Sequence, residues 1–422
     1  MTQTLDLSGI DFRNPDTYAD GVPYESFRLL RQHDPVHWHP EQAPDPGFWA
    51  IMKHADIVAI SKDAKLFSSA ERFIYYEEID AESMEIRRSM IETDAPEHTR
   101  LRRIISPLFT PKTVDVYRVY AQQIADRLLD NAEATGEFDW VNDVCEMMPI
   151  RVFASVFGAP ESDADYLAKL ANQLVAIDDP DLAPLPEAYD RARARGFEPH
   201  QLPFRSPAAL DLFDYMRDLC TARREHPQDD LVTRLVQAEW EGEHLTDSEL
   251  VNICQLLVFA GNETTRNSLA SGMLAFIEHP DQLDQLDQDR SLMKGAVEEI
   301  LRWATPIYCF RRTAMADTVV RGVNMKKGDK VVLYYTSGNF DEDVFDDPMR
   351  FDVTRDASEQ IVFGGGGPHY CLGAFLARMQ VETLFTTLLD RGLRLELSGP
   401  TTRLRTNFAN ALKKMPVRII QG

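Results

Sequence analysis

The sequence predicts a mainly α-helical protein with a smaller β-rich region, and three observations support this fold class. Apolar residues recur with helical periodicity from about Thr99 to Ala304. One of these patterns, from Thr246 to Ile277, is long enough for a helix that spans the whole molecule. After Pro306 the pattern changes to short strand-like runs. We expect a single domain over residues 1–422, because no internal repeat or low-complexity tract divides the chain.

The part of the chain before Thr99 mixes helical patterns with short β-like runs such as Phe48–Met52. Further on, the segment 178–207 contains six prolines, which break helices, although Glu187–Arg195 fits one short helix. A long loop in a compact domain is often a lid over a binding site. A plain surface connection explains the same composition, so both interpretations stay open.

The long helix has a clear start and a clear end. Thr246 and Glu249 form a capping-box pattern, and Pro280 stops the helix after Ile277. About 32 residues at a rise of about 1.5 Å each would cross roughly 48 Å.

Strands are expected after Pro306. Thr318–Val323 and Lys330–Tyr335 alternate like strands around the turn residues 327–329. Next, the extended run Ile361–Phe363 leads into four glycines. A helical pattern then runs from Leu372 to about Leu389.

The composition limits the classes of function. The formal net charge of -23 repels phosphate backbones, so we expect no nucleic-acid partner. The five cysteines are scattered and suggest no disulfide framework, which fits a reducing cytoplasmic compartment. Residues 1–14 do not resemble a signal peptide, and no apolar run is long enough to span a bilayer. We therefore expect a cytoplasmic monomer without a membrane anchor.

The segment Phe363–Gly373 carries the strongest chemical signal. Its glycines let backbone approach a flat ligand closely, and Cys371 precedes a helix whose free N–H groups favour an anionic sulfur and lower its pKa. A nucleotide-binding glycine loop is a weaker explanation, because the Gly-x-Gly-x-x-Gly spacing fails. A structural helix cap with a buried cysteine explains the segment about as well as a thiolate that ligates a metal.

This segment resembles the cysteine-ligand loop of the cytochrome P-450 superfamily, Phe-x-x-Gly-x-His/Arg-x-Cys-x-Gly. The resemblance implies the P-450 fold, with a long central helix over a buried haem b, and makes Cys371 the axial ligand of its iron. Phe363, Gly365 and Gly373 would lie beside the cofactor. One extra glycine moves Phe363 one residue further from Cys371 than usual. Similar lengthened loops occur in relatives that oxidise sterol side chains and methyl-branched lipids.

Two more motifs match the same superfamily. Glu299 and Arg302 fit its Glu-x-x-Arg pair, which shares one helical face and braces the cysteine loop. The segment 260–265, Ala-Gly-Asn-Glu-Thr-Thr, fits its central-helix motif. A glycine and polar residues in an apolar helix break a local rule, which favours a functional interpretation. The resemblance implies that Ala260 contacts haem and that Glu263 and Thr264 are the catalytic acid–alcohol pair that delivers protons to dioxygen.

A further motif supplies groups for the carboxylates of haem. His98 and Arg102 lie four residues apart on one helical face, and both side chains donate hydrogen bonds to carboxylates. In the superfamily these positions bind the haem propionates. Arg312 and His369 match two further propionate contacts. The motifs follow the family order along nearly the whole chain, which is far more specific than any single motif.

The resemblance implies a haem-thiolate monooxygenase that inserts one oxygen atom of O2 into a C–H bond. The chain has no flavin or iron–sulfur motif, so electrons would come from a ferredoxin and an NAD(P)H-dependent reductase. Arg100, Arg103 and Lys112 lie where the family docks an acidic ferredoxin. A haem-thiolate peroxygenase that uses H2O2 is the alternative class, and Glu263 with Thr264 favours dioxygen.

The substrate is expected to be an apolar small molecule, because the candidate pocket walls are apolar or aromatic. Two segments, 257–269 and 309–352, look similar to enzymes for monoterpene alcohols such as linalool and to enzymes for sterol side chains and methyl-branched lipids. We predict hydroxylation of a terpenoid at a terminal or allylic methyl, with a steroid side chain or branched lipid as the alternative. The predicted wall residues are Ile74, Val258, Phe259, Ile307, Phe310 and Phe408.

Overall fold

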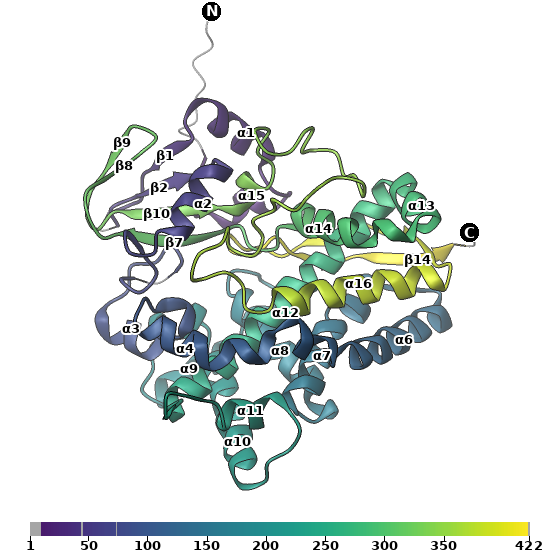
Figure 1. Ribbon diagram of the computed structural model, residues 1–422, viewed down its shortest axis with the longest axis horizontal. Coiled ribbons are helices and arrows are strands. Elements are labelled where there is room, and N and C mark those ends of the chain that lie inside the picture. The colour runs from purple at the N-terminus through teal and green to yellow at the C-terminus, as the bar shows by residue number, and fades with distance from the viewer. Residues whose placement is uncertain (1–9, 44, 73, 421–422) are drawn as a thin grey trace, which may run out of the picture.

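A single long helix organises the computed structural model, which describes residues 10–43, 45–72 and 74–420. Helix α12 (Asp247–Glu278) has 32 residues and runs through the middle of the molecule (Figure 1). The predicted capping box is present, because the Thr246 side chain accepts from the Glu249 N–H and the Glu249 carboxylate accepts from the Thr246 N–H. The predicted start, end and length of this helix are therefore confirmed.

Most of the other long helices pack around α12. Those in direct contact with it are α7 (Met147–Phe157), α8 (Ala164–Val175), α10 (Ala208–Glu225), α14 (Met293–Ala304) and α16 (Ala374–Asp390). Gly272 marks the crossing with α14 and α16, since a Cβ there would lie 2.7 Å from Ile300 and 3.1 Å from Phe385. A mainly α-helical fold is thus confirmed, and its core is built on α12.

The remaining helices are shorter or lie outside this layer. Their bounds are α1 (Tyr24–His33), α2 (His54–Lys62), α3 (Ala81–Arg87), α4 (Glu97–Ile105), α5 (Pro111–Asp115), α6 (Arg118–Thr135), α9 (Pro186–Ala194), α11 (Leu231–Val236), α13 (Pro280–Gln288) and α15 (Tyr335–Gly338). Helix α9 confirms the short helix predicted inside the proline-rich segment 178–207. Pro186 occupies its first turn, where the missing N–H costs nothing.

The β-rich region is one five-stranded sheet and several small ones. The large sheet has the order β1 (Val36–His39), β2 (Phe48–Ile51), β10 (Lys330–Tyr334), β7 (Cys309–Ala314) and β3 (Phe67–Ser68). Only the β2–β10 pair is parallel. A three-stranded sheet joins β11 (Arg394–Leu397), β14 (Pro416–Ile420) and β4 (Glu137–Asp139). Two-stranded hairpins pair β5 (Glu239–Trp240) with β6 (Glu243–His244), β8 (Thr318–Val320) with β9 (Val323–Met325), and β12 (Thr402–Arg403) with β13 (Leu412–Lys414).

Two local expectations are wrong. The predicted strand Thr318–Val323 is instead the hairpin β8–β9, because the chain reverses at Arg321 and Gly322, both with positive φ. The expected extended run before the glycines is not a strand, since residues 362–363 lie in a turn. The helix expected from Leu372 begins at Ala374, which is within the usual uncertainty of helix ends.

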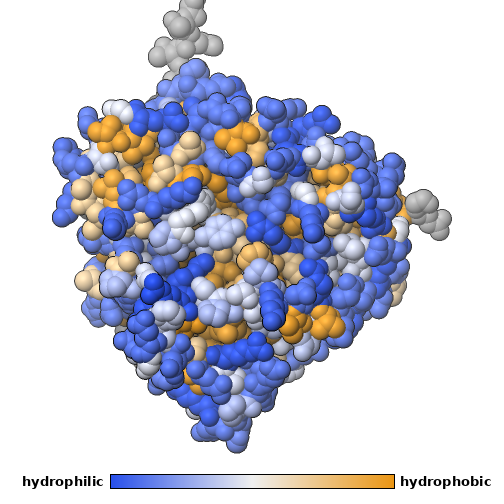
Figure 2. All heavy atoms as spheres, in the orientation of Figure 1, coloured by the Kyte–Doolittle hydropathy of each residue, from blue (hydrophilic) through white to orange (hydrophobic). Residues whose placement is uncertain are grey.

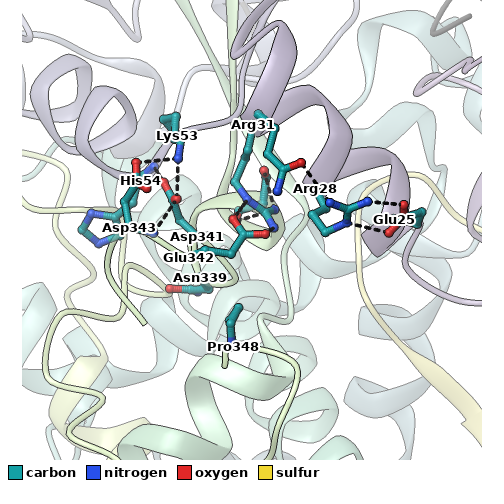
Figure 3. Close-up of polar contacts among 12 residues, drawn as sticks. Glu25, Arg28, Arg31, Lys53, His54, Asn339, Asp341, Glu342, Asp343 and Pro348 are labelled. Carbon is teal, nitrogen blue, oxygen red and sulfur yellow. Dashed lines mark hydrogen bonds and ion pairs between the residues drawn. The ribbon is translucent and has the colours of Figure 1, made fainter. Parts of the chain in front are cut away.

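An ionic cluster fixes the N-terminal helices to the chain that follows α15 (Figure 3). Arg31 of α1 donates to both carboxylate oxygens of Glu342 at 3.0 and 2.9 Å. Lys53, just before α2, donates to Asp341 at 2.9 Å and to Asp343 at 2.6 Å. This arrangement holds in place the segment 339–348, which contributes backbone to the site described below.

The surface in Figure 2 is mostly hydrophilic, and its hydrophobic residues form small separate groups. Within the described ranges, we find no helix with the length and apolar character that crossing a membrane requires. Residues 1–9, on which part of the signal-peptide prediction rests, lie outside the described residues.

Candidate functional site

The glycine loop before Cys371 depends on glycine at every one of its four positions. Gly364, Gly365, Gly366 and Gly367 have φ values of +98°, +67°, +96° and +76°, which other residues rarely adopt. A Cβ at Gly367 would also lie 2.2 Å from the Ser61 carbonyl oxygen at the end of α2. A Cβ at Gly365 would point toward Val58 and Ser61 of α2 at 3.5 and 3.4 Å. The lengthened loop is therefore packed tightly against α2.

The loop closes on itself at Cys371, whose N–H donates to the Phe363 carbonyl at 2.9 Å. The extra glycine thus leaves Phe363 and Cys371 in backbone contact. The Phe363 ring is buried beneath the Arg378 guanidinium, 4.3 Å from its carbon to the ring centroid. Arg378 is in turn held by Glu298 at 2.6 and 2.9 Å. Phe363 is therefore fixed by α16 and α14 as well as by the loop.

The surroundings of the Cys371 sulfur differ from expectation in one respect. Burial raises the pKa of the thiol, and this outweighs the Gly373 N–H and the guanidinium groups of Arg102 and Arg378, which lower it. The helix N-terminus thus lowers the pKa as predicted, through the Gly373 N–H, but burial, which the sequence does not report, raises it by more. Gly373 lies next to α16 with open space beside it, because a Cβ there would meet nothing within 4 Å.

The residues predicted to bind carboxylates come together next to this loop. The His98 ring from α4 lies 4.2 Å from the His369 ring, and Arg102 is close enough to Cys371 to lower its pKa. Arg312 from β7 is close enough to His369 to lower the pKa of that ring as well. We refer to His98, Arg102, Arg312 and His369 as the basic cluster.

Within the described residues, the two arginines of the basic cluster are not balanced by acidic groups. No carboxylate pairs with Arg102 or Arg312 among the described residues, and Arg312 donates only to the neighbouring Arg311 carbonyl at 2.8 Å. Burial, together with His369 and Arg102, lowers the pKa of His98 to about 4, so this ring is neutral at pH 7. The buried His369 Nε2 has no hydrogen-bond partner within the described chain. Such a cluster fits a ligand that carries carboxylates.

Asp94 is the one acidic group beside the cluster. Its carboxylate accepts hydrogen bonds from the Ser68 hydroxyl and, at 3.1 Å, from the Ser69 N–H, and lies 3.9 Å from His369. Burial by itself raises the pKa of Asp94. The hydrogen bonds and charge from His369 and the two serines lower it by more, so the resulting pKa is about 2. Asp94 belongs to the motif that suggested His98, yet the sequence assigned it no role, because its partners Ser68 and Ser69 come from β3 and the residue after it.

The turn Met90–Glu92 before α4 contains a buried carboxyl group, Glu92, whose pKa is raised, whereas that of Asp94 is lowered. The Glu92 carboxylate accepts from the Ser89 N–H at 2.9 Å and from the Ser89 hydroxyl at 2.6 Å. Burial nevertheless raises the pKa of Glu92 to about 7. In the unfolded chain, Glu92 loses its proton above its ordinary pKa of about 4.5. In the folded protein, Glu92 keeps this proton up to a pH of about 7.

Glu92→Gln is expected to remove this pH dependence. The contribution of Glu92 to stability is complete below pH 4.5 and is lost as the pH rises through 7. The difference in unfolding free energy, variant minus wild type, should thus increase from pH 4.5 to pH 8 by on the order of 2–3 kcal/mol. Urea unfolding at several pH values measures it. Glu85→Gln, at an exposed position of α3, is the control and should show no such change.

The predicted central-helix motif places its members on different sides of α12. Ala260 is exposed in the middle of the helix, and Gly261 and Thr264 are half-buried. We call these three residues the accessible face of α12. The Thr264 hydroxyl donates to the Ala260 carbonyl at 2.8 Å. An exposed position in the middle of a core helix indicates room for a ligand.

Glu263 lies away from this face. It is fully buried, and its Oε1 accepts from Arg266 at 2.9 Å and from Asn267 at 3.2 Å. Its Oε2 has no partner within the described residues. The structure therefore does not join the Glu263 carboxylate to the Thr264 hydroxyl. Sequence reasoning missed Arg266, although an arginine three residues after a glutamate is a common helical ion pair.

Most predicted wall residues gather around an aromatic cluster. The Phe408 ring lies 6.1 Å from both Phe259 and Phe310, measured between ring centroids. Ile74 packs beside Phe310, and Ile307 is half-buried and pairs with Ala409 as a β-bridge. Val258 is the exception, since it is fully buried and lies about 200° around the helix from Ala260. Its predicted place in the wall does not fit this geometry.

Phe204 joins this cluster and was not predicted. Its ring centroid lies 4.4 Å from that of Phe259 and 5.5 Å from that of Phe408. Phe204 belongs to the proline-rich segment 178–207 and has a positive φ of 53°. No sequence periodicity could have placed a loop residue against α12. The segment therefore contacts the candidate substrate wall directly.

The predicted docking residues for a redox partner are not equivalent. Arg100 forms ion pairs with Glu249 of α12 and with Glu243 of the β5–β6 hairpin. Arg103 is exposed with its guanidinium 5.0 Å from the Trp240 ring centroid, and Lys112 is exposed on α5. Arg100 is thus already neutralised, and Arg103 and Lys112 remain as candidates.

The predicted pair between Glu299 and Arg302 on α14 is confirmed. Both side chains are fully buried, and their two hydrogen bonds measure 2.7 and 2.8 Å. The Arg302 Nη1 also donates to the backbone carbonyls of Asn339 and Pro348, two residues that Figure 3 shows below the ionic cluster. Arg355 and the Asp352 N–H donate to Glu299 Oε1. The pair therefore ties α14 to the chain between α15 and the glycine loop.

Comparisons with known proteins agree with the fold and identify the family. The sequence profile described as Cytochrome P450 matches residues 46–416. The steroid C26-monooxygenase of Mycobacterium tuberculosis is 38% identical over 420 residues, which cover 97% of this chain and 92% of that protein. The linalool 8-monooxygenase of Pseudomonas putida is 35% identical over 418 residues, covering 97% and 98%.

A solved structure supports the same family. A cytochrome P450 of Mycobacterium marinum in complex with pseudoionone superimposes with a TM-score of 0.86 at 34% identity, covering 97% of this chain and 98% of that one. The matches extend over nearly the whole chain and include the cysteine loop, the central helix and the Glu299–Arg302 pair. On these grounds the chain is a monooxygenase of the cytochrome P450 family.

Proposed function

We propose that this P450 holds haem b through Cys371 and hydroxylates an apolar terpenoid at a terminal or allylic methyl. The observation that carries the cofactor assignment is the basic cluster, in which Arg102 and Arg312 have no carboxylate partner among the described residues. Haem b carries two propionates, which match this need. When bound, it supplies the activation of O2 for insertion of one oxygen atom into a C–H bond.

Each part of the site has a role in this proposal. The Cys371 sulfur would ligate the iron, and metal coordination would stabilise its thiolate against the burial that raises its pKa. The basic cluster would bind the propionates. Ala260, Gly373, Phe363 and Gly365 would line the cofactor, and small residues at three of these four positions allow a flat ligand to approach.

Removing the two unpaired arginines is expected to weaken cofactor retention. Arg102→Leu and Arg312→Leu each take away a charge-assisted hydrogen bond, which is worth roughly 1.5–3 kcal/mol. Each substitution should therefore speed the loss of haem to an apo-globin acceptor by on the order of ten- to a hundredfold. Arg103→Leu, the exposed neighbour of Arg102, is the matched control. Equal rates in all three variants would rule out the propionate assignment.

Glu263 and Thr264 are proposed to manage protons beside the accessible face of α12, on which only Thr264 lies. Thr264 donates its proton to the Ala260 carbonyl, so its hydroxyl must rotate before it can donate toward the reacting centre. Arg266 and Asn267 hold one oxygen of Glu263, and its other oxygen has no partner in the described chain. The Glu263 side chain must therefore turn away from Arg266 and Asn267 before its carboxylate can reach Thr264.

The terpenoid assignment rests on the aromatic cluster. Phe204, Phe259, Phe310 and Phe408 form a cluster in which neighbouring ring centroids lie 4.4 to 6.1 Å apart, so the candidate wall is apolar and aromatic. Such a wall suits an apolar terpenoid. Similarity to linalool 8-monooxygenase supports this choice. A steroid side chain is the second candidate, because it is equally apolar and a steroid C26-monooxygenase is 38% identical.

Electrons are proposed to come from a ferredoxin and an NAD(P)H-dependent reductase, with the protein working as a cytoplasmic monomer. Arg103 and Lys112 are exposed cations on a chain of net charge -23 and offer an acidic partner a local site. Reversing both charges should slow electron transfer from an acidic ferredoxin. The peroxygenase alternative needs no partner, so turnover with H2O2 alone and none with ferredoxin would replace the proposed reaction.

A binding and turnover screen tests the substrate. The holoenzyme is titrated with linalool-type alcohols and with sterols that have a branched side chain, and displacement of the iron-bound water is followed as a Soret shift. Products formed with ferredoxin, reductase and O2 are then identified. Tighter binding and terminal-methyl hydroxylation of the terpenoids would support the proposal. Turnover of the sterols alone would replace it with the second candidate, and no shift with either set would exclude both.

A further inference from the structure

Two cysteines outside the proposed haem site lie next to each other between helices. Cys220 of α10 and Cys254 of α12 are 34 residues apart in sequence, and their sulfur atoms are 3.8 Å apart. The other described cysteines lack such a partner, since Cys309 contacts the Tyr76 hydroxyl and no sulfur contact involves Cys145 or Cys371. We infer that Cys220 and Cys254 form a reversible disulfide under hydrogen peroxide, which locks α10 onto α12.

The geometry allows this bond without a rearrangement of the helices. A disulfide needs a sulfur–sulfur distance of about 2.05 Å, so the two atoms must approach by roughly 1.8 Å. Rotation about χ1 moves a cysteine sulfur by that amount while its backbone stays in place. Helices α10 and α12 already pack directly on each other. The two sulfurs are therefore close enough to react and too far apart to be bonded in the reduced protein.

A cleft brings small oxidants close to Cys220, which lines it and is 2% exposed. The cleft has a volume of about 600 Å³ and lies between α3, α10 and the first turns of α12. Cys220 contributes to its wall, together with apolar residues that include Ile86, Phe213 and Val251. Cys254 is fully buried behind Cys220. Cys220 therefore meets the oxidant first, and Cys254 follows.

The pKa shifts of the two thiols also indicate that Cys220 reacts before Cys254. The hydrogen bond from the Cys254 thiol lowers the pKa of Cys220, and nearby Arg224 adds to this effect against burial and Asp247. Burial and the same hydrogen bond raise the pKa of Cys254. Thiolates are the nucleophilic form of cysteine, so Cys220 is the attacking group and Cys254 the resolving one.

The reaction balances with hydrogen peroxide as the only oxidant. The Cys220 thiolate attacks one peroxide oxygen, an S–O bond forms, the O–O bond breaks and hydroxide leaves, which takes up a proton as water. The Cys254 sulfur then attacks the Cys220 sulfur. The S–S bond forms, the S–O bond breaks, and the leaving oxygen takes the Cys254 proton to give the second water. Two thiols are oxidised and one peroxide is reduced, and an external dithiol reverses the change.

The position of the pair indicates what the bond would control. Helix α10 directly follows the segment 178–207, whose Phe204 packs on Phe259. Cys254 lies six residues before Ala260 on the same helix, which is about 9 Å along its axis. A bond between α10 and α12 would therefore hold the segment 178–207 against the substrate wall. The bond itself does not depend on the proposed substrate, because the pair lies outside the wall residues.

The experiment exposes the holoenzyme to hydrogen peroxide at one to ten equivalents, quenches it by thiol alkylation and maps the unreduced peptides by mass spectrometry. We expect a peptide that links Cys220 to Cys254 and that dithiothreitol removes. Cys220→Ser should abolish the link, and Cys145→Ala should keep it as the matched control. Sulfinic or sulfonic acid at Cys220 without the link would overturn the proposal, and so would five unmodified thiols.

Hydrogen exchange tests the consequence without any substrate. Amide exchange in residues 178–225 should become about tenfold slower in the bridged protein and return to its starting rate after reduction. The peroxide-treated Cys220→Ser variant should exchange at the starting rate. Since Cys220 borders the cleft, this variant is expected to fold. A bridge that leaves exchange in this segment unchanged would overturn the proposed locking. Neither readout changes if the substrate proves to be a sterol.

Discussion

Cys371→Ala is expected to abolish turnover and the red-shifted Soret band of the reduced, carbon monoxide-treated holoenzyme. Cys371 is the one cysteine of the glycine loop, and alanine has no lone pair that could replace its sulfur. A thiolate ligand would donate electron density to haem iron and favour O–O cleavage, and alanine supplies no such ligand. Turnover should fall by on the order of a thousandfold or more, equivalent to about 4 kcal/mol of activation free energy.

The design of this test separates ligation from folding. Cys145→Ala removes another buried cysteine and should keep both the band and the activity. The Cys371→Ala protein should still fold, because the loop is fixed by its glycines, by Phe363 beneath Arg378 and by the contacts of Gly367 with α2. Far-UV circular dichroism confirms this. A Cys371→Ala variant that kept the red-shifted band would show that another group ligates the iron.

The features that the sequence predicted well depend on local rules. The long helix follows from an apolar pattern, a capping box and a proline, all of which act within a few residues. The Glu299–Arg302 pair follows from the three-residue spacing on one helix. The basic cluster is different, because its members come from α4, β7 and the glycine loop. Only the resemblance to a known family brought these distant residues together before the structure did.

The features that the sequence missed depend on tertiary packing. Phe204 sits in a proline-rich loop, where no periodicity assigns a direction to a side chain. Val258 belongs to an apolar run in which every residue suits either a core or a pocket, and only the rotation of α12 distinguishes them. Likewise, burial raises the pKa of Cys371 although the adjacent helix end lowers it. Depth of burial is a property of the whole fold, so a local motif cannot report it.

The glycine loop, one residue longer than the family pattern, is supported from two sides. The Cys371 N–H and the Phe363 carbonyl lie 2.9 Å apart. Gly365 and Gly367 pack on Val58 and Ser61 of α2. The Phe363 ring lies beneath Arg378 on the other side. The loop is therefore held between α2 and α16.

Arg302→Leu is expected to destabilise the protein by about 3 kcal/mol or more, which is the lower part of the range for breaking a buried ion pair. The variant leaves the Glu299 carboxylate in a fully buried site. Arg355 at 3.3 Å and the Asp352 N–H at 3.1 Å still donate to it, which places the cost at the lower end. The Asn339 and Pro348 carbonyls also lose their donor. Unfolding by guanidinium chloride measures the change.

A second substitution distinguishes an unpaired charge from lost packing. In the double variant Glu299→Leu, Arg302→Met, no carboxylate remains unpaired, and apolar replacements of buried ion pairs are often neutral or stabilising. It should therefore recover most of the stability that Arg302→Leu loses. Arg28→Leu breaks the exposed Glu25–Arg28 pair of α1 and should show no measurable change. If the double variant recovered no stability relative to Arg302→Leu, the hydrogen bonds from Arg302 to Asn339 and Pro348, which both variants lack, would be the dominant contribution. Because these two carbonyls belong to the segment that leads toward the glycine loop, the retention of haem should then fall together with stability.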